Sequence, residues 1–362
     1  MRVFLIGILF CLFLLGSCIQ ENANHEKIIG VKIYDHQGDL NELFGSLESA
    51  GINTLFVSPE LARKQGFITL AKERSMPVFL IVPTFYNPDV LHQDSSLYAI
   101  TAEGNIAIDD WVEFICPNRK NYKRNHLEYL KSLVEELSPN GISIDFIRYF
   151  VFWEKVYPDH SILDLPQTCF DDTCLTTFTA KYDIRYPENV DNRKEKVNYI
   201  LEQLDLEWTD FKVNTITSYV QEITQTLNKI DPSLRFNLHF VPWKDTDFNG
   251  AIRKVAGQDL NILSPLVDYI SPMCYTHMLK RPPDFVHDIV LNFYDRNATH
   301  KILPSIQVSR AYLDSSFSVE EFEIALRSSL EPPSWGVIFW SWEALEKDPE
   351  KLEIVKNAIT IK

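Results

Sequence analysis

The chain has 362 residues, of which 50 are acidic and 35 are basic, so its net charge is −15 at neutral pH. Hydrophobic residues make up 45% and aromatic residues 12%, which is enough for a large buried core and too much for a disordered chain. Nucleic-acid binding needs a basic surface, so the acidic balance excludes nucleic acid as a partner.

The first residues carry the pattern of an export signal. Arg2 precedes an uninterrupted apolar run, Val3 to Leu15, which is too short for a membrane span and fits a signal-peptide core. The next string, Leu15-Gly16-Ser17-Cys18, resembles a bacterial lipobox, in which the signal is cut before the cysteine and the cysteine is acylated, for example with palmitate. An ordinary secretory signal with a chance cysteine is the alternative.

The lipobox reading divides the chain into a signal peptide at 1–17, a lipidated polar tether at 18–27 and a folded domain at 28–362. It predicts a lipoprotein of the bacterial cell envelope, anchored to the membrane through Cys18 on the periplasmic or cell-surface side.

Short apolar, β-branched runs alternate with amphipathic stretches along the rest of the chain. The expected strands are Ile28–Tyr34, Ile52–Ser58, Pro77–Phe85, Gly141–Arg148, Arg235–Pro242, Val267–Tyr275, Ile302–Val308 and Gly336–Trp342. The expected helices include Leu40–Ala50, Leu61–Arg74, Tyr122–Leu137, Val319–Leu330 and Pro349–Ile359. Ser318 is a good helix N-cap, and Ser138-Pro139-Asn140-Gly141 is a typical helix stop.

This rhythm predicts an α/β fold with a single (β/α)8 TIM barrel. A doubly wound sheet is the alternative, but it requires a glycine-rich phosphate turn after the first strand, where the chain instead reads Ile33-Tyr34-Asp35-His36-Gln37. Two long segments, Asn87–Asn121 after the third strand and Phe150–Asn192 after the fourth, are expected to be insertions at the C-terminal mouth, where barrel enzymes build their sites.

The cysteines outside the N-terminal segment are compatible with export. In an oxidising compartment Cys169 and Cys174 can close a small disulfide loop, or they can stay as two free thiols. A metal site is less favoured because no second Cys/His pair lies nearby in sequence at zinc spacing, so no metal ligand is assigned.

Asp145 is the first candidate for chemistry. Strand alternation places Ile142 and Ile144 toward the covering helices, so Ser143 and Asp145 point into the barrel. A buried carboxylate needs a partner, and Arg148 is close enough in sequence to provide it. A purely structural Asp–Arg pair is the alternative.

The string Asp145-Phe-Ile-Arg-Tyr149 resembles the Asp-Tyr-Ile-Arg-Phe/Tyr signature of uncharacterised glycosidase-like barrels found in bacterial lipoproteins. Asp268-Tyr-Ile-Ser-Pro-Met-Cys-Tyr275 and Trp335-Gly-Val-Ile-Phe-Trp-Ser-Trp342 resemble the sixth and eighth strands of chitinase-like barrels, glycoside hydrolase family 18, and their relatives. The resemblance implies a glycoside hydrolase in which Trp340 forms the base of the sugar site and Tyr149 shapes it.

The chain departs from family 18 at its acid. The family motif Asp-x-x-Asp-x-Asp-x-Glu would place Ser143 on an aspartate and Ile147 on the acid glutamate. The substrate-assisted mechanism of that family is therefore not carried over, and the acid must come from another position.

Glycoside cleavage typically uses two carboxylates. We predict Asp145 as the first and Glu343, directly after Trp342 at the end of the eighth strand, as the second. A helix N-terminal charge is the alternative role for Glu343. Three rim carboxylates are held in reserve: Glu154, Asp110 and Asp245.

Aromatic rings at the expected strand ends fit the apolar faces of sugars, and histidines can bond their hydroxyls. The predicted glycan-binding residues are Arg148, Tyr149, His239, Trp243, Tyr275, His277 and Trp340. No cofactor pattern is present. The sequence therefore predicts a glycoside hydrolase; the alternatives are a non-catalytic carbohydrate-binding barrel and a metal-dependent hydrolase of another class.

Overall fold

A closed ring of parallel strands forms the centre of the protein. The computed structural model describes residues 26–296 and 301–360. The sheet runs β10-β11-β1-β2-β3-β6-β7-β8-β9, and pairing of β10 with β8 closes it. Its strands are β1 (Ile28–Ile33), β2 (Thr54–Val57), β3 (Val78–Pro83), β6 (Gly141–Asp145), β7 (Arg235–Phe240), β8 (Tyr269–Cys274), β9 (Lys301–Ile302), β10 (Ser305–Gln307) and β11 (Gly336–Trp340). The predicted TIM barrel is confirmed.

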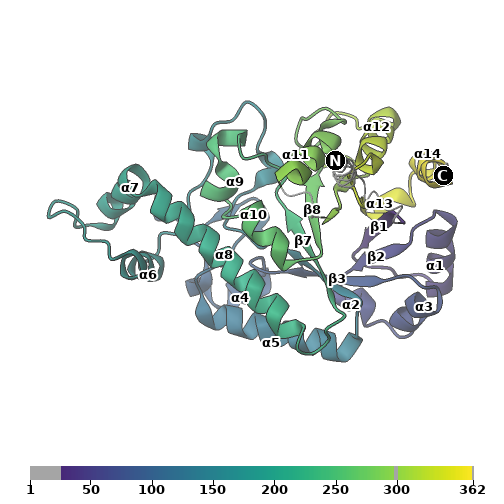
Figure 1. Ribbon diagram of the computed structural model, residues 1–362, viewed down its shortest axis with the longest axis horizontal. Helices are drawn as coiled ribbons and strands as arrows, with labels where there is room; N and C mark the ends of the chain where they lie inside the picture. The colour runs from purple at the N-terminus through teal and green to yellow at the C-terminus, as the bar shows by residue number, and fades with distance from the viewer. Residues whose placement is uncertain (1–25, 297–300, 361–362) are drawn as a thin grey trace, which may run out of the picture.

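Helices surround this ring (Figure 1). They cover the apolar outer faces of the strands, and this layer between strands and helices holds most of the hydrophobic core. The helices that follow the strands are α1 (Leu40–Ser49), α2 (Pro59–Ala62), α3 (Phe67–Glu73), α5 (Lys120–Leu137), α8 (Asp205–Leu227), α9 (Ala251–Lys254), α10 (Leu260–Leu263), α11 (Phe285–Arg296), α12 (Val319–Leu330), α13 (Trp342–Leu345) and α14 (Pro349–Thr360).

Local signals explain where several elements begin and end. Ser318 caps α12 in a capping box with Glu321, and Ser138 ends α5 in a left-handed conformation. The single helix expected over Leu61–Arg74 is wrong: Gly66, with φ of +87°, divides the segment into α2 and α3. The expected seventh strand is divided into β9 and β10 at Pro304, which has no N–H for the ladder.

The two long segments at the mouth have short elements of their own. The first contains α4 (Pro88–Gln93), β4 (Ile108–Asp109) and β5 (Val112–Glu113). The second contains α6 (Asp172–Tyr182), and α7 (Arg193–Gln203) follows directly after it. The segments pair with each other, since Thr101 bridges Thr168 and the N–H of Phe170 donates to Ile100 at 2.9 Å. In Figure 1, α6, α7 and the start of α8 project from the barrel.

The interior of the barrel changes character along its axis. One end is filled by an apolar group of Phe56, Phe79, Ile81, Leu303 and Ile338. Toward the C-terminal ends of the strands the inward side chains become polar, and Ser143 on β6 contacts His239 on β7 at 3.0 Å. The predicted inward direction of Ser143 is therefore observed, and the polar half lies where barrel enzymes place their chemistry.

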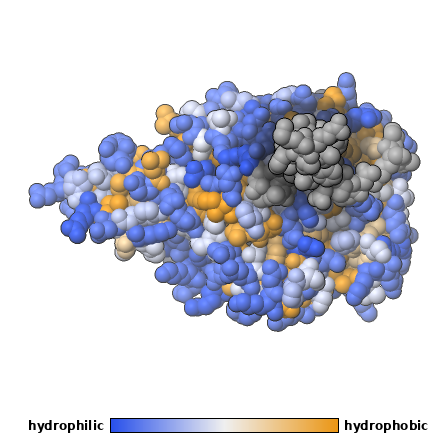
Figure 2. Space-filling view, viewed as in Figure 1, coloured by the Kyte–Doolittle hydropathy of each residue, from blue (hydrophilic) through white to orange (hydrophobic). Residues whose placement is uncertain are grey.

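The outer surface agrees with the acidic, polar composition. The face seen in Figure 2 is largely hydrophilic, with hydrophobic residues in small scattered groups. Among residues 26–296 and 301–360, no helix is long and apolar enough to cross a membrane. The predicted signal peptide and Cys18 lie outside the described residues.

Gly141, at the start of β6, tests the packing inside the barrel. A Cβ there would lie 2.3 Å from Phe79 Cε1 and 2.6 Å from the carbonyl oxygen of Arg235. We expect Gly141→Ala to lower the free energy of unfolding by about 1–3 kcal/mol, measured by denaturant unfolding. The matched control is Gly45→Ala in α1, where a Cβ meets nothing within 4 Å and should stabilise the helix slightly. Equal effects of the two substitutions would contradict this account.

Candidate active site

Four charged side chains are buried together at the C-terminal end of the barrel. Lys32 is 1% exposed, Asp145 7%, Arg148 2% and Glu154 8%. We call these four residues the mouth cluster. Charges of both signs act on one another there. Burial lowers the pKa of Lys32 and that of Arg148, and Asp145 and Glu154 act to raise both. Isolated charges this deeply buried would be very costly, so the opposite signs are what permits the arrangement.

Asp145 is positioned by the end of β6. Directly after the strand, Phe146 has a φ of +50°, and its N–H donates to Asp145 Oδ1 at 2.7 Å. This bond fixes one carboxylate oxygen against the backbone. Arg148 follows three residues later and acts to lower the pKa of Asp145, but among the described residues no ion pair joins the two side chains.

The Arg148 guanidinium is held by two aromatic rings. Its central carbon lies 4.9 Å from the ring centre of Phe114 and 5.0 Å from that of Phe146. Its Nη2 donates to the carbonyl oxygen of Val151 at 3.3 Å, while its buried Nε has no hydrogen-bond partner. Cation–π contacts of this kind hold a guanidinium in place and leave its N–H groups available to carboxylates.

Lys32 enters the mouth cluster from β1. Its Nζ donates to the hydroxyl oxygen of Tyr275 at 3.3 Å, and that hydroxyl also lies 3.4 Å from Ser305 Oγ. The sequence analysis missed Lys32, although a signal was present: a lysine in the apolar run Ile28–Ile33 is costly to bury unless it has a specific role.

Burial affects the two carboxylates of the mouth cluster in different ways. It raises the pKa of Glu154 to about 7, against the opposing effect of Arg148. Burial also acts to raise the pKa of Asp145, but Lys32, the Phe146 N–H and Arg148 oppose it, and that pKa lies below its ordinary value. Near neutral pH the site therefore contains one ionised carboxylate and one that binds a proton.

The neighbouring bases are shifted toward their neutral forms. Burial lowers the pKa of Lys32 to about 8, although Asp145 and Glu154 oppose the shift. Burial, assisted by Lys32, lowers the pKa of His239 to about 3. A neutral His239 fits its contact with Ser143, which in turn accepts a hydrogen bond from Asn237 at 2.9 Å.

Aromatic rings border the mouth cluster. Tyr275 and Trp340 stack with ring centres 4.7 Å apart and an interplanar angle of 22°. The ring centre of Trp153, the neighbour of Glu154, lies 5.7 Å from that of Tyr275, and the two rings are tilted by 38°. The predicted residues Tyr275 and Trp340 are therefore brought together with the carboxylates.

Glu343 lies at the rim of the barrel, where it connects the helix after the last strand, β11, to the end of the first strand, β1. Its Oε1 accepts hydrogen bonds from the backbone N–H groups of Tyr34 at 2.8 Å and Asp35 at 3.3 Å, which ties α13 to the end of β1. Its buried Oε2 has no hydrogen-bond partner. Glu343 and Asp145 both act to raise the pKa of Tyr34, after the larger effect of burial, so both carboxylates lie near this phenol.

The other predicted sugar-binding residues are not grouped with the carboxylates. Tyr149 is fully buried, and its hydroxyl accepts from Asn118 Nδ2 at 3.1 Å. Trp243 is buried against Phe248, with ring centres 5.2 Å apart. His277 contacts Ser315 Oγ through Nε2 at 3.1 Å.

Two of the three reserve carboxylates are engaged in ion pairs. Asp110 pairs with Lys155 at 3.1 Å, and Asp245 pairs with Arg296. Only the third, Glu154, lies in the mouth cluster. It sits on a short 3-10 turn at 153–155, an irregular position that periodicity in the sequence does not locate.

Cys169 and Cys174 are buried, and both are free thiols. Of the two possibilities left open by the sequence, the structure therefore shows the free thiols. It also places a third thiol, Cys116, beside them: its Sγ lies 3.2 Å from that of Cys174. The sequence analysis missed this convergence because Cys116 belongs to the other mouth segment.

Glu154 gives the site a measurable pH signature. Its folded pKa lies above that of an exposed glutamate, so folding becomes less favourable as the pH rises from about 4.5 to about 7. Between pH 5 and pH 8 we expect Glu154→Gln to gain about 2–3 kcal/mol of unfolding free energy relative to the unsubstituted chain. Urea unfolding at several pH values measures this difference. The exposed Glu346→Gln is the control, and a gain that does not vary with pH would refute the assignment.

Comparison with solved structures identifies similar folds. The glycoside hydrolase domain of PgaB (BpsB) from Bordetella bronchiseptica matches with a TM-score of 0.70 and 9% identity, over 93% of this chain and 100% of that one. Gan42B, a GH42 β-galactosidase from G. stearothermophilus, matches with a TM-score of 0.64 and 12% identity, over 93% and 57%. A β-galactosidase from the psychrophilic Marinomonas ef1 matches with a TM-score of 0.63 and 11% identity, over 91% and 58%.

Neither a protein-family model nor a curated protein sequence matches this chain. This chain spans a little more than half the length of the two β-galactosidases. The predicted resemblance to glycoside hydrolase barrels is confirmed at the level of the fold, whereas the resemblance to family 18 stays a prediction. The chain thus has the (β/α)8 fold of these glycoside hydrolase domains.

Proposed function

We propose that the protein is an extracytoplasmic glycoside hydrolase that cleaves O-glycosyl bonds in a poly- or oligosaccharide. The observation that carries this proposal is the opposite perturbation of two buried carboxylates, Asp145 and Glu154, at one barrel mouth. Glycoside hydrolysis needs one carboxylic acid and one carboxylate on either side of the bond. The barrel fold shared with solved glycoside hydrolase domains supports the same activity.

Each carboxylate takes the step that its protonation state allows. Glu154, protonated up to about pH 7, donates its proton to the oxygen of the leaving sugar as the glycosidic bond breaks. Asp145 stays ionised and either attacks the anomeric carbon or removes a proton from the attacking water. Water supplies the hydroxyl group of the new reducing end, and its remaining proton restores the acid.

The cations of the mouth cluster help to keep the two carboxylates in different protonation states. Lys32 and Arg148 stabilise the ionised form of Asp145, while burial keeps the proton on Glu154. The neutral imidazole of His239 is buried in the polar half of the barrel, where it contacts Ser143 and adds no charge beside Asp145.

The stacked rings of Tyr275 and Trp340 support a sugar substrate. Trp340 is partly exposed and can offer apolar surface to the C–H groups of a pyranose, while the buried ring of Tyr275 supports it from the other side. Trp153, the neighbour of Glu154, is fully buried and packs against Tyr275. The proposal therefore places the sugar next to the stacked rings, with the scissile bond toward Asp145 and Glu154.

Glu154 fits the acid better than Glu343 does. The Oε1 of Glu343 accepts hydrogen bonds from two backbone N–H groups, so this side chain holds the loop after β1. Glu154 differs in that burial raises its pKa to about 7, so it holds the proton that an acid must donate. We therefore propose Glu343 as a positioning residue for the rim around Tyr34.

The catalytic assignment is tested on the full-length chain with a broad panel of bacterial, plant and host glycans. We expect Asp145→Asn and Glu154→Gln each to lower kcat/KM by about 100- to 10,000-fold, because each removes one half of the acid–base pair. Released sugars and new reducing ends, separated by chromatography, measure the activity. Asp110→Asn, at an ion-paired rim carboxylate, is the matched control. Full hydrolysis by Asp145→Asn would overturn the role of Asp145, and saturable glycan binding without product would favour a carbohydrate-binding barrel.

The pH profile of kcat/KM separates Glu154 from Glu343. Activity should decline as the pH rises through about 7, because Glu154 then loses the proton that it donates. Glu154→Gln should remove this alkaline decline from any residual activity, whereas Glu343→Gln should keep it at a lower rate. The reverse result would assign the acid to Glu343.

The proposed location rests on the lipobox-like string that ends at Cys18. If Cys18 is acylated, cells supplied with labelled palmitate should incorporate the label into the chain and retain it in the membrane fraction. Cys18→Ser should abolish the incorporation, and Cys11→Ser, within the expected signal, is the control. Incorporation that survives Cys18→Ser would rule out this anchor.

A further inference from the structure

Three cysteines and one aspartate meet beside the barrel mouth, although they come from two separate segments. Cys116 follows β5, whereas Cys169, Asp171 and Cys174 lie at the start of α6. All four residues are buried, and their three sulfur atoms and one carboxylate oxygen lie within 4.8 Å of one another. We call these four residues the cysteine cluster.

The sulfur atoms converge on one carboxylate oxygen. Cys169 Sγ lies 2.9 Å from Asp171 Oδ2, and Cys174 Sγ lies 3.3 Å from the same atom. Cys116 completes the group through its 3.2 Å contact with Cys174 Sγ. A tetrahedral Zn²⁺ with bonds of about 2.3 Å to sulfur and 2.0 Å to oxygen separates its ligand atoms by roughly 3.5–3.8 Å. Small side-chain movements therefore convert this group into such a shell.

Hydrogen-bond donors surround the cysteine cluster. The backbone N–H of Ile100 donates to Cys169 Sγ at 3.2 Å, and Asn118 Nδ2 donates to Cys174 Sγ at 3.2 Å. The backbone N–H of Cys174 donates to Asp171 Oδ1 at 3.0 Å, which leaves Oδ2 directed toward the sulfurs. Such donors orient and stabilise the ligands of a metal site. A disulfide between two of these cysteines would be uncharged, and it would leave the third thiol and the carboxylate unused.

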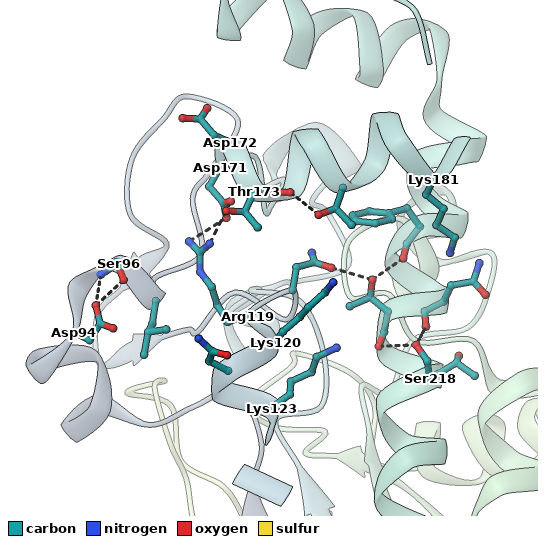
Figure 3. Close-up of a pocket in the computed structure, with 18 of the residues that line it drawn as sticks. Asp94, Ser96, Arg119, Lys120, Lys123, Asp171, Asp172, Thr173, Lys181 and Ser218 are labelled. Carbon is teal, nitrogen blue, oxygen red and sulfur yellow. Dashed lines mark hydrogen bonds and ion pairs between the residues drawn. The ribbon is translucent and has the colours of Figure 1, made fainter. Parts of the chain in front are cut away.

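Arg119, a cation just outside the cysteine cluster, would offset part of the negative charge of its ligands. Arg119 pairs with Asp171 at 3.2 Å, and Figure 3 shows the Arg119 side chain pointing toward Asp171. Three thiolates and one carboxylate bring four negative charges, of which a divalent ion neutralises two, so a guanidinium at this position is favourable. Arg119 and Asp171 also line a surface pocket of about 1170 Å³, which gives an ion a path toward the cluster.

We propose that Cys116, Cys169, Asp171 and Cys174 bind one Zn²⁺ as a structural site. Soft thiolate ligands select zinc over magnesium or calcium, and four protein ligands leave no open position for catalysis. As each Zn–S bond forms, a thiol releases its proton to solvent, so loading releases up to three protons and transfers no electrons.

The ion would join the two segments that form the sides of the mouth. Phe114, whose ring packs on Arg148, lies two residues before Cys116. Asn118, two residues after Cys116, bonds to the hydroxyl of Tyr149. A zinc ion in the cysteine cluster would thus fix the first segment against the second close to the mouth cluster without taking part in the reaction.

Metal analysis and cobalt spectroscopy of the full-length chain test the proposal. Purified with reductant, the chain should hold one zinc per molecule by mass spectrometry of the metal. After removal of zinc, added Co²⁺ should give the sulfur-to-cobalt charge-transfer band and the intense visible bands of a tetrahedral thiolate site. Cys116→Ser should weaken Co²⁺ binding by at least about 100-fold. Cys274→Ser, at a buried free thiol in β8, should leave the spectrum unchanged.

Three outcomes would overturn the zinc site. The first is a reduced, folded chain that binds neither Zn²⁺ nor Co²⁺, and the second is equal loss of binding in Cys116→Ser and Cys274→Ser. The third is a disulfide between two cluster cysteines in the chain as isolated from cells. If Cys116→Ser does not fold, the cobalt spectrum of the unsubstituted chain decides, because its charge-transfer intensity reports the number of thiolates.

Discussion

The cost of burying charge organises this protein around one end of its barrel. Lys32 enters the mouth from β1 and Asp145 from β6, while Arg148 and Glu154 come from the segment that follows β6. None of these charges is stable there alone, so the two cations are accompanied by the ionised Asp145 and by the carboxyl group of Glu154. The same balance sets the protonation state of each carboxylate. The positive charges near Asp145 keep it ionised, whereas the cost of burying a second negative charge keeps a proton on Glu154.

The strand ring follows closely from the sequence because its strands are short, apolar and separated by helices with ordinary start and stop signals. Asp145 was also predictable, since alternation along Gly141–Asp145 leaves a carboxylate on the inner face. The same argument applied to Ile28–Ile33 would have found Lys32, where an inner-face lysine interrupts an apolar run. The helix predicted over Leu61–Arg74 and the predicted seventh strand are each divided in two for a local reason. Gly66 is left-handed, and Pro304 lacks an N–H.

Contacts between distant loops were beyond the reach of the sequence. Glu154 lies on a single irregular turn, and nothing in its neighbours indicates that it folds back beside Asp145. The meeting of Cys116 with Cys174 depends on the pairing of 100–102 with 167–170, which joins two segments without helical or strand periodicity. Periodicity predicts which face of an element is buried, but it carries no information about which loops meet.

The position of Arg148 between Phe114 and Phe146 has an evolutionary consequence. One charge of the site belongs to the segment after β6, whereas one of the two rings that hold it belongs to the segment after β3. A change of length or composition in either loop would displace the guanidinium, so the two loops are expected to diversify together rather than separately. Exchange of a single loop with a related barrel would break this contact, and transplanting the specificity of this mouth into another barrel would require both loops at once.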